Sequence, residues 1–263
     1  MRVLLLGPTG NLGLRMIPAL IVHGHQLTVF VRNPSKLRSL VSSELLDLIH
    51  AVVVGDATDA SALEKTLVDH DIEGIIDVAG NQVLPWKEYI LPKIAKAISD
   101  AALTVGKARG RPLRIWVTSG LFILKVPGTN MAISDYFPRL ATAQHDATRA
   151  VVESIPTADL KWSLIAVSGM VARDPKQGLF QVLEAPQSHH FLASATIAPV
   201  WRTSWVQCIP VLGMIIHGIA MAWWDYRTKY EDMADFLAED LAVGGGKWVG
   251  KKVGVVNISK KDG

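Results

Sequence analysis

Three glycines near the amino terminus have the spacing of a phosphate-binding turn. Gly7, Gly10 and Gly13 are three residues apart and directly follow the apolar run Val3–Leu6. The first glycine permits a sharp turn, the second lets a pyrophosphate approach the backbone, and the third lets a helix pack against a strand. A helix starting here would direct free N–H groups and its dipole at an anion. The turn predicts a dinucleotide site, whose other residues are Thr9, Asn11 and Leu12.

Two basic residues follow the second apolar run, 27–31. Arg32 occupies the place where NAD-preferring folds commonly carry an acidic residue for the ribose 2′-OH, and Lys36 lies about one helical turn later. A guanidinium can pair with a 2′-phosphate, which a carboxylate would repel. The alternative is that both cations only solvate a loop. The pattern predicts NADP(H) as the cofactor.

Small and polar residues follow the third and fourth apolar runs, 51–54 and 74–78. Asp56 can accept a hydrogen bond from an adenine amino group, or it can serve only as the cap of the next helix. Ligands bind at the carboxyl ends of strands in open α/β sheets, and small residues there let a ribose lie close. We therefore add to the expected cofactor site Ala57, Ala79, Gly80, Asn81 and, after the fifth run, Thr118.

Apolar runs alternate with helical patterns over the first two thirds of the chain. This alternation predicts right-handed βαβ units and an α/β fold, a Rossmann-type doubly wound parallel sheet over residues 1–167. The expected strands are 3–6, 27–31, 51–54, 74–78, 113–117 and 162–167, and the main helices are 12–23, 61–67, 89–105 and 140–154. Residues 229–263 are expected to rejoin this core through a helix, 230–241, and a strand, 252–258.

The alternation fails after Val167, and residues 168–228 are predicted to form a smaller, apolar substrate-binding lobe. No charged residue lies between Arg202 and Asp225, and five of the eight tryptophans lie at or after Trp201. We expect a helical lid over an apolar pocket, or a dimer face, and an aromatic or polycyclic small molecule as substrate. Two alternatives involve a membrane. A span is disfavoured by Pro210, Gly213 and Gly218 within the stretch, whereas docking of 203–224 on a membrane surface would suit its adjacent tryptophans.

Five motifs, GPTGNLG, VRNPSKL, VVGDATD, VAGN and VTSG, resemble those of the atypical short-chain dehydrogenase/reductase family. Within that family the chain is most similar to the NmrA-like group and to the flavin reductase/biliverdin reductase B group. The resemblance covers residues 1 to 167, and the segment 229–241 is similar to that group's C-terminal helix. It implies use of NADP and leaves the reaction open.

The resemblance also provides candidate catalytic residues. Ordinary members use a Tyr-x-x-x-Lys pair, in which the tyrosine protonates the substrate oxygen. Tyr136, just before the helix expected to carry this pair, is the nearest candidate, but the residue four positions later is Leu140 rather than a lysine. Ser119 resembles a serine near the nicotinamide in biliverdin reductase B-like enzymes, and His145 resembles a histidine on the helix that normally carries the pair. Structural roles for both remain open. The group's histidine after the sixth strand is absent from 167–170.

Composition narrows the function classes. The net charge is only +3 and no long basic block occurs, so nucleic acid is not an expected partner. Cys208 is the single cysteine, which together with the lack of a signal-peptide pattern predicts a reducing, cytoplasmic location. The adjacent His189 and His190 diverge and have no further ligand at metal spacing, so no metal site is expected.

The combined prediction is an NADPH-dependent reductase of a lipophilic small molecule, as a monomer or homodimer. Two alternatives stay open. One is a non-redox cyclase, isomerase or dehydratase of secondary metabolism, and the other is a non-catalytic regulator that senses NADP.

Overall fold

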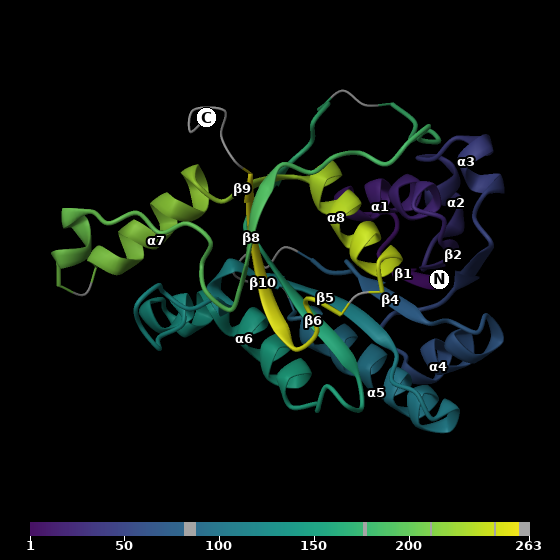
Figure 1. Ribbon diagram of the computed structural model, residues 1–263, viewed down its shortest axis with the longest axis horizontal. Coiled ribbons are helices and arrows are strands. Elements are labelled where there is room, and N and C mark those ends of the chain that lie inside the picture. The colour runs from purple at the N-terminus through teal and green to yellow at the C-terminus, as the bar shows by residue number, and fades with distance from the viewer. Residues whose placement is uncertain (82–87, 176–177, 211, 245, 258–263) are drawn as a thin grey trace.

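The computed structural model describes residues 1–81, 88–175, 178–210, 212–244 and 246–257. Its main sheet has eight strands in the order β3-β2-β1-β4-β5-β6-β10-β8 (Figure 1). The first six of these form the doubly wound order 3-2-1-4-5-6, which confirms the predicted Rossmann-type fold. The eight strands of the sheet are β1 (Arg2–Leu6), β2 (Gln26–Val31), β3 (Ala51–Val54), β4 (Gly74–Asp77), β5 (Arg114–Gly120), β6 (Lys161–Val167), β8 (Phe191–Ala195) and β10 (Lys251–Asn257).

Helices cover both faces of the sheet because its strands bury both of their sides. Leu4 and Leu6 of β1 belong to a core cluster with α4, α5 and α6, whereas Val3 and Leu5 belong to a second cluster with α1 and α8. This double burial explains why the strands read as continuous apolar runs rather than alternating patterns. The helices are α1 (Asn11–Val22), α2 (Pro34–Arg38), α3 (Ser43–Asp47), α4 (Ala60–Asp69), α5 (Leu91–Arg109), α6 (Arg139–Glu153), α7 (Gly213–Trp224) and α8 (Tyr230–Ala242).

Most predicted boundaries differ from the structure by one to four residues. Helix α5 begins at Leu91 instead of Tyr89, since Pro92 favours the first turn, where its missing N–H costs no hydrogen bond. Strand β10 ends at Asn257, and Ile258 lies outside the described residues.

The six predicted strands of residues 1–167 pair parallel, and the structure adds one antiparallel strand that was not predicted. Strand β8 pairs antiparallel with β10 at the edge. The reason is the path of residues 172–175 and 178–190, which we call the strap. The strap runs across α8 and α1 before β8 enters the sheet from the opposite direction (Figure 1). At its far end, Phe180 pairs with the backbone beside α3: its N–H donates to Leu40 O at 3.0 Å, and its carbonyl accepts from Ser42 N at 2.9 Å.

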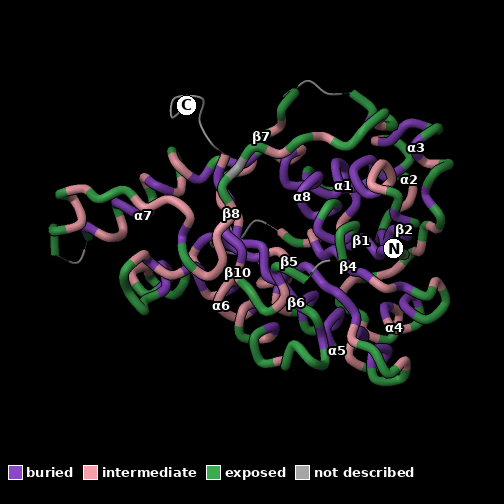
Figure 2. The backbone as a smooth tube through the Cα atoms, viewed as in Figure 1, coloured by how far each residue is buried: buried purple, intermediate pink, exposed green. Residues whose placement is uncertain are grey.

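The same stretch of chain also contains a small parallel pair, β7 (Gly169–Val171) with β9 (Arg227–Lys229). Residues 202–210 and 212–224 form a further part, which we call the arm. The arm contains α7 and projects from the body of the molecule (Figure 1). Much of its tube is coloured as intermediate or exposed rather than buried (Figure 2). None of the helices within the described ranges has both the length and the apolar character needed to cross a membrane.

Candidate active site

The glycine turn after β1 brings three backbone segments into close contact. Gly7 has φ +78°, and a Cβ there would lie 2.7 Å from the backbone of Ala79 after β4. A Cβ on Gly13 would lie 2.0 Å from the Gly7 carbonyl oxygen. Both positions therefore require glycine, because β1, β4 and α1 meet here without room for a side chain. Of the three roles expected from the spacing, the turn and the close helix packing are visible directly.

The N-terminus of α1 is open toward solvent. Its capping residue Gly10 offers no side chain, Gly10 and Asn11 are exposed, and the first turn carries no acid. The first N–H groups of a helix have no intrahelical partners, so this turn presents donors to an anion. Leu12 is buried behind them, and Thr9 is half-buried. This cradle fits the pyrophosphate of a dinucleotide.

Tyr230, the first residue of α8, adjoins the same turn. The Asn11 side-chain amide donates to the Tyr230 hydroxyl at 3.5 Å. The two residues are 219 positions apart, so no local pattern could have indicated the contact.

The two predicted 2′-phosphate ligands are exposed at the ends of neighbouring elements. Arg32 follows β2, and Lys36 lies in α2, whose N-cap Asn33 accepts from the Lys36 N–H at 3.0 Å. Within the described ranges, no salt bridge involves either side chain. The Arg32 charge does reach Asp56, as the third contribution that lowers the pKa of that carboxyl. Both cations are thus available to an anionic ligand at this edge.

Asp56 is held by a local turn and does not cap α4. Its carboxylate accepts from the Thr58 N–H at 2.8 Å and from the Thr58 hydroxyl at 2.7 Å, and these bonds are the main reason that the pKa of Asp56 is lowered. The cap is Asp59, which accepts from the N–H groups of Ser61 and Ala62. The capping alternative for Asp56 was therefore wrong. Asp56 remains an exposed, ionised acceptor beside the half-buried Ala57.

The end of β4 contains a buried acid that the sequence reasoning missed. Asp77 accepts from the Ala79 N–H at 3.0 Å, and complete burial raises its pKa to about 7. The Thr118 hydroxyl donates to the Asp77 carbonyl at 2.8 Å, so Thr118 joins β5 to β4. The available signal was an acid that ends an apolar strand directly before small residues.

The remaining residues of this loop have mixed surroundings. Gly80 is exposed, and a Cβ on it would lie 2.6 Å from the tip of the Leu91 side chain. The Asn81 amide donates to the Glu88 carbonyl at 3.1 Å, while its side-chain oxygen is buried without a partner among the described residues.

Unpartnered polar atoms gather where β5 meets α6. Ser119 is 1% exposed and its hydroxyl has no partner within the described part of the chain. The His145 ring lies against the next residue, Gly120, where a Cβ would be 2.8 Å from two of its atoms. His145 Nδ1 is also buried and unpartnered, and burial lowers the pKa of its imidazole. Gln144, which the sequence reasoning missed, adds a buried, unpartnered side-chain oxygen. Such atoms are costly unless a ligand or water satisfies them.

Tyr136 is separate from this group in hydrogen-bonding terms. It ends the short 3₁₀ helix Ile133–Tyr136 and its hydroxyl donates to the Met131 sulfur at 3.2 Å. Ser119 and His145 are brought to adjoining elements, whereas no hydrogen bond links Tyr136 to either of them in the described residues.

Aromatic side chains extend from His145 to the arm. The ring of Phe122 is centred 6.4 Å from His145 and 4.9 Å from Phe137. Phe137 in turn lies against Gly218 of α7, where a Cβ would approach its ring to 2.7 Å. The polar atoms therefore adjoin an apolar, aromatic wall, and the inner side of α7 contacts that wall.

A family model described as NAD(P)H-binding matches residues 7–200, about three quarters of the chain. The chain belongs to this NAD(P)H-binding family. The match confirms that the expected dinucleotide site is one for NAD(P)H, without distinguishing NADPH from NADH. No curated protein sequence matches the chain.

Solved structures share the fold of this NAD(P)H-binding protein along nearly its whole length. A protein from Lactobacillus casei is 14% identical, with 98% of this chain and 100% of the other covered and a TM-score of 0.66. A proposed NAD-dependent epimerase/dehydratase from Bacillus halodurans is 16% identical, covering 98% and 95%, with a TM-score of 0.59. A proposed NADH-flavin reductase from Streptococcus pneumoniae is 13% identical, covering 98% and 100%, also at 0.59.

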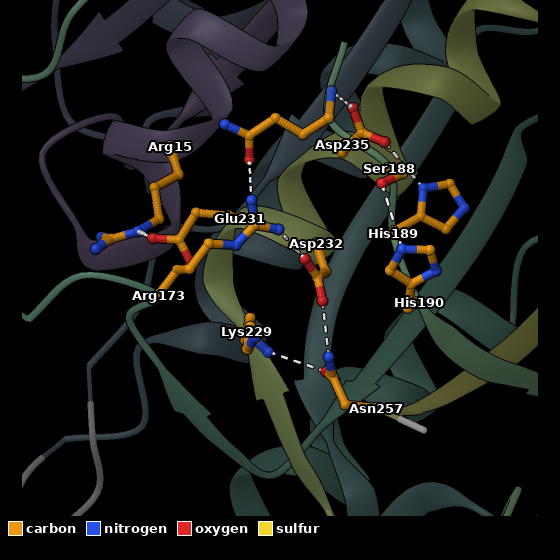
Figure 3. Close-up of polar contacts among 11 residues, drawn as sticks. Arg15, Arg173, Ser188, His189, His190, Lys229, Glu231, Asp232, Asp235 and Asn257 are labelled. Atoms are coloured by element: carbon orange, nitrogen blue, oxygen red, sulfur yellow. Dashed lines mark hydrogen bonds and ion pairs between the residues drawn. The ribbon is translucent and has the colours of Figure 1, made fainter. Parts of the chain in front are cut away.

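The paired histidines of the strap serve a structural network. Figure 3 shows His189 beside Asp235 of α8, with Nδ1 2.9 Å from the carboxylate, and His190 beside Ser188. The first-turn acids Glu231 and Asp232 hold Arg173 at the start of the strap. In the described ranges, no three or more His, Cys, Asp or Glu side chains are grouped as metal ligands would be.

Proposed function

We propose that the protein is an NADPH-dependent oxidoreductase that reduces a lipophilic, aromatic or polycyclic small molecule. The observation that carries the proposal is the unpartnered Ser119 hydroxyl at the carboxyl end of β5. Ser119 precedes Gly120, which contacts the His145 ring. Its strand, β5, pairs with β4, and the end of β4 touches the glycine turn. A polar group set against an apolar wall is a common arrangement for a small-molecule site.

NADPH would supply the hydride from its nicotinamide ring. Ser119 would donate a hydrogen bond to the substrate oxygen or to the nicotinamide amide. His145 would act as a neutral imidazole, since burial disfavours its charged form and lowers its pKa. The Tyr136 hydroxyl is engaged by Met131 and has no lysine partner, so the proton that completes reduction would come from water. The aromatic wall of Phe122 and Phe137 favours a flat, apolar acceptor.

The preference for NADPH rests on Arg32 and Lys36 and is tested by titrating both cofactors. We expect NADPH to bind at least about tenfold more tightly than NADH, because a charge-assisted contact contributes about 1.5–3 kcal/mol. Arg32→Asp should abolish or reverse the preference. Arg38→Asp, a change at an exposed arginine of the same segment, is the control and should leave it unchanged. Equal affinities in the wild type, or a preference retained in Arg32→Asp, would contradict the assignment.

The role of Ser119 is tested with quinones and flavins as acceptors. Ser119→Ala should lower kcat by about 10²-fold, the usual effect of losing one positioned donor. The Kd for NADPH should change much less, because the contacts to the cofactor's phosphates are intact. Ser99→Ala is a matched control, because Ser99 in α5 is equally buried and its hydroxyl is also unpartnered. Undiminished turnover in Ser119→Ala would remove this residue from the mechanism.

The same assays separate the alternatives. Conversion of a substrate without consumption of NADPH would indicate a non-redox isomerase, cyclase or dehydratase. Tight NADPH binding without turnover of any acceptor would indicate an NADP-sensing regulator.

A further inference from the structure

The outer side of the arm is apolar and faces solvent. Leu212, Ile216, Ile219 and Trp223 are spaced by four, three and four residues, so they line one side of α7, and they are 48% to 65% exposed. At the two ends of the arm, side chains of the same character are exposed as well, Trp205 by 78% and Trp224 by 73%. Scattered apolar residues are normal on a surface, but a continuous row of this kind marks a contact site.

The inner side of the same helix is already used. Met221 is buried in the core cluster, Gly218 lies against Phe137, and the His217 ring is centred 5.1 Å from that of Trp201. Helix α7 is therefore apolar on both sides, yet only one side packs on the protein. A helix that is apolar all round requires an apolar environment on its second side too.

Two environments could cover this apolar surface, a second copy of the arm or a lipid bilayer, and the charges at its edge distinguish between them. Arg202 is 72% exposed, and Arg227 and Lys229 lie exposed just beyond α7. The single acid of residues 202–229 is Asp225, whose side chain is 8% exposed and bound to Arg202 at 2.7 Å. A second copy of the arm would bring further cations and no free acid to meet them, whereas anionic lipid headgroups complement this edge.

The exposed tryptophans of the arm also favour contact with lipid headgroups. Trp223 carries the Arg227 guanidinium 6.0 Å from its ring centre, and Arg227 Nε donates to the Trp223 carbonyl at 2.9 Å. An indole combines an apolar body with one N–H donor and is enriched at the headgroup level of membranes. A helix with apolar residues and tryptophan toward the bilayer and cations at its edge is typical of interfacial binding.

We propose that the outer side of α7, with Trp205 and Trp224, docks on the surface of an anionic lipid bilayer. The helix would lie in the headgroup region without crossing the membrane. Docking does not depend on the reductase activity proposed above. One consequence does rest on it: the inner side of α7 contacts Phe137, so a docked arm would bring the candidate site beside the source of a lipophilic substrate.

Flotation with lipid vesicles tests the docking on the full chain without any cofactor. We expect the wild type to float with vesicles of phosphatidylcholine containing roughly one-third phosphatidylserine, to float less with phosphatidylcholine alone, and to lose binding at high salt. The double variant Trp223→Ser/Trp224→Ser should lose at least about tenfold in partition coefficient, because both indoles would leave the bilayer. Arg227→Gln and Lys229→Gln should each weaken binding by roughly fivefold, the effect of one cation near an anionic surface.

Val243→Ser is the matched control, because Val243 is 77% exposed but lies outside the arm, and it should float as the wild type does. Unchanged circular-dichroism melting and NADPH affinity would show that the arm variants are folded. The proposal is overturned if the wild type stays in the aqueous fraction with both vesicle types, or if the tryptophan variant floats equally well. It is also overturned if the arm instead drives concentration-dependent dimerisation without lipid binding. Flotation without turnover would refute only the reductase.

Discussion

Asp77 is a buried acid whose pKa is raised from 3.8 to about 7. It ends a buried strand next to the glycine turn, and burial favours its neutral form. Its backbone carbonyl accepts from Thr118 while its side chain accepts from the Ala79 N–H. The carboxyl thus fixes the β4–α5 corner, where Ala79 also adjoins Gly7.

This raised pKa predicts a pH dependence of folding. Between the unfolded pKa of 3.8 and the folded value of about 7, the folded protein retains a proton that the unfolded chain releases. The free energy of unfolding should therefore fall as pH rises through this window, by about 3 kcal/mol between pH 5 and pH 8 for this one group. Asp77→Asn keeps the acceptor for Ala79 and should remove that part of the dependence.

Urea denaturation of both proteins at the two pH values measures the difference. The exposed Asp159→Asn provides the control and should follow the wild type. Parallel pH profiles for wild type and Asp77→Asn would show that the carboxyl is ionised in the folded state.

At the scale of elements, the unit of β1, the glycine turn and α1 contains glycines with different roles. We expect Gly13 to be needed for folding and Gly10 to be needed for cofactor binding. A Cβ on Gly13 would lie 2.0 Å from the Gly7 carbonyl, which neither the strand nor the helix can avoid without shifting. A Cβ on Gly10 would lie at 3.4 Å from the same atom, in ordinary contact, and Gly10 has φ −83°.

We expect Gly13→Ala to lower the free energy of unfolding by about 1–3 kcal/mol, the usual range for overpacking. Gly10→Ala should unfold as the wild type does but bind NADPH more weakly, because its methyl group occupies the space that a pyrophosphate needs. Denaturation and cofactor titration of both variants give the comparison. Equal stability of the two variants would mean that α1 moves freely on β1.

The strap and the arm show how elements without a regular pattern acquire their place. The strap is held by ion pairs and hydrogen bonds to α8 (Figure 3). The arm, in contrast, is held by one apolar side of α7. Neither attachment is local in sequence. The sequence predicted one apolar lobe over 168–228, but the structure places the strap and the arm in opposite parts of the molecule.

At the scale of the whole molecule, a buried ion pair joins the C-terminal helix to the centre of the sheet. Arg114 of β5 binds Asp240 of α8 at 3.0 Å, and Trp116 Nε1 donates to the same carboxylate at 2.9 Å. Both charged side chains are about 5% exposed or less. Burial lowers the pKa of Arg114, and the charge of Asp240 opposes that shift.

Asp240→Ala leaves the buried guanidinium without its partner and should cost about 3–5 kcal/mol of unfolding free energy. Asp69→Ala breaks the exposed pair with Lys65 and should cost less than about 1 kcal/mol. Urea denaturation compares the two. A small effect of Asp240→Ala would indicate that water or a shifted acceptor satisfies Arg114.

The sequence by itself determined the features that depend on neighbouring residues. The six alternating strands, the glycine turn and the basic residues after β2 follow from periodicity and from the conformational freedom of glycine, both of which act over a few positions. The fold class and the NAD(P)H-binding family were predictable on this basis, and so was the edge of the sheet that carries the candidate site.

Only the tertiary structure decided what lies together across long separations. Burial of Asp77, the contact of Gly120 with the His145 ring of α6, and the contact of Tyr230 with Asn11 each require elements that pack from distant parts of the chain. The antiparallel β8 and the two sides of α7 have the same origin. Apolar composition predicts that a segment leaves water, but packing decides which side is buried and which side remains for a partner.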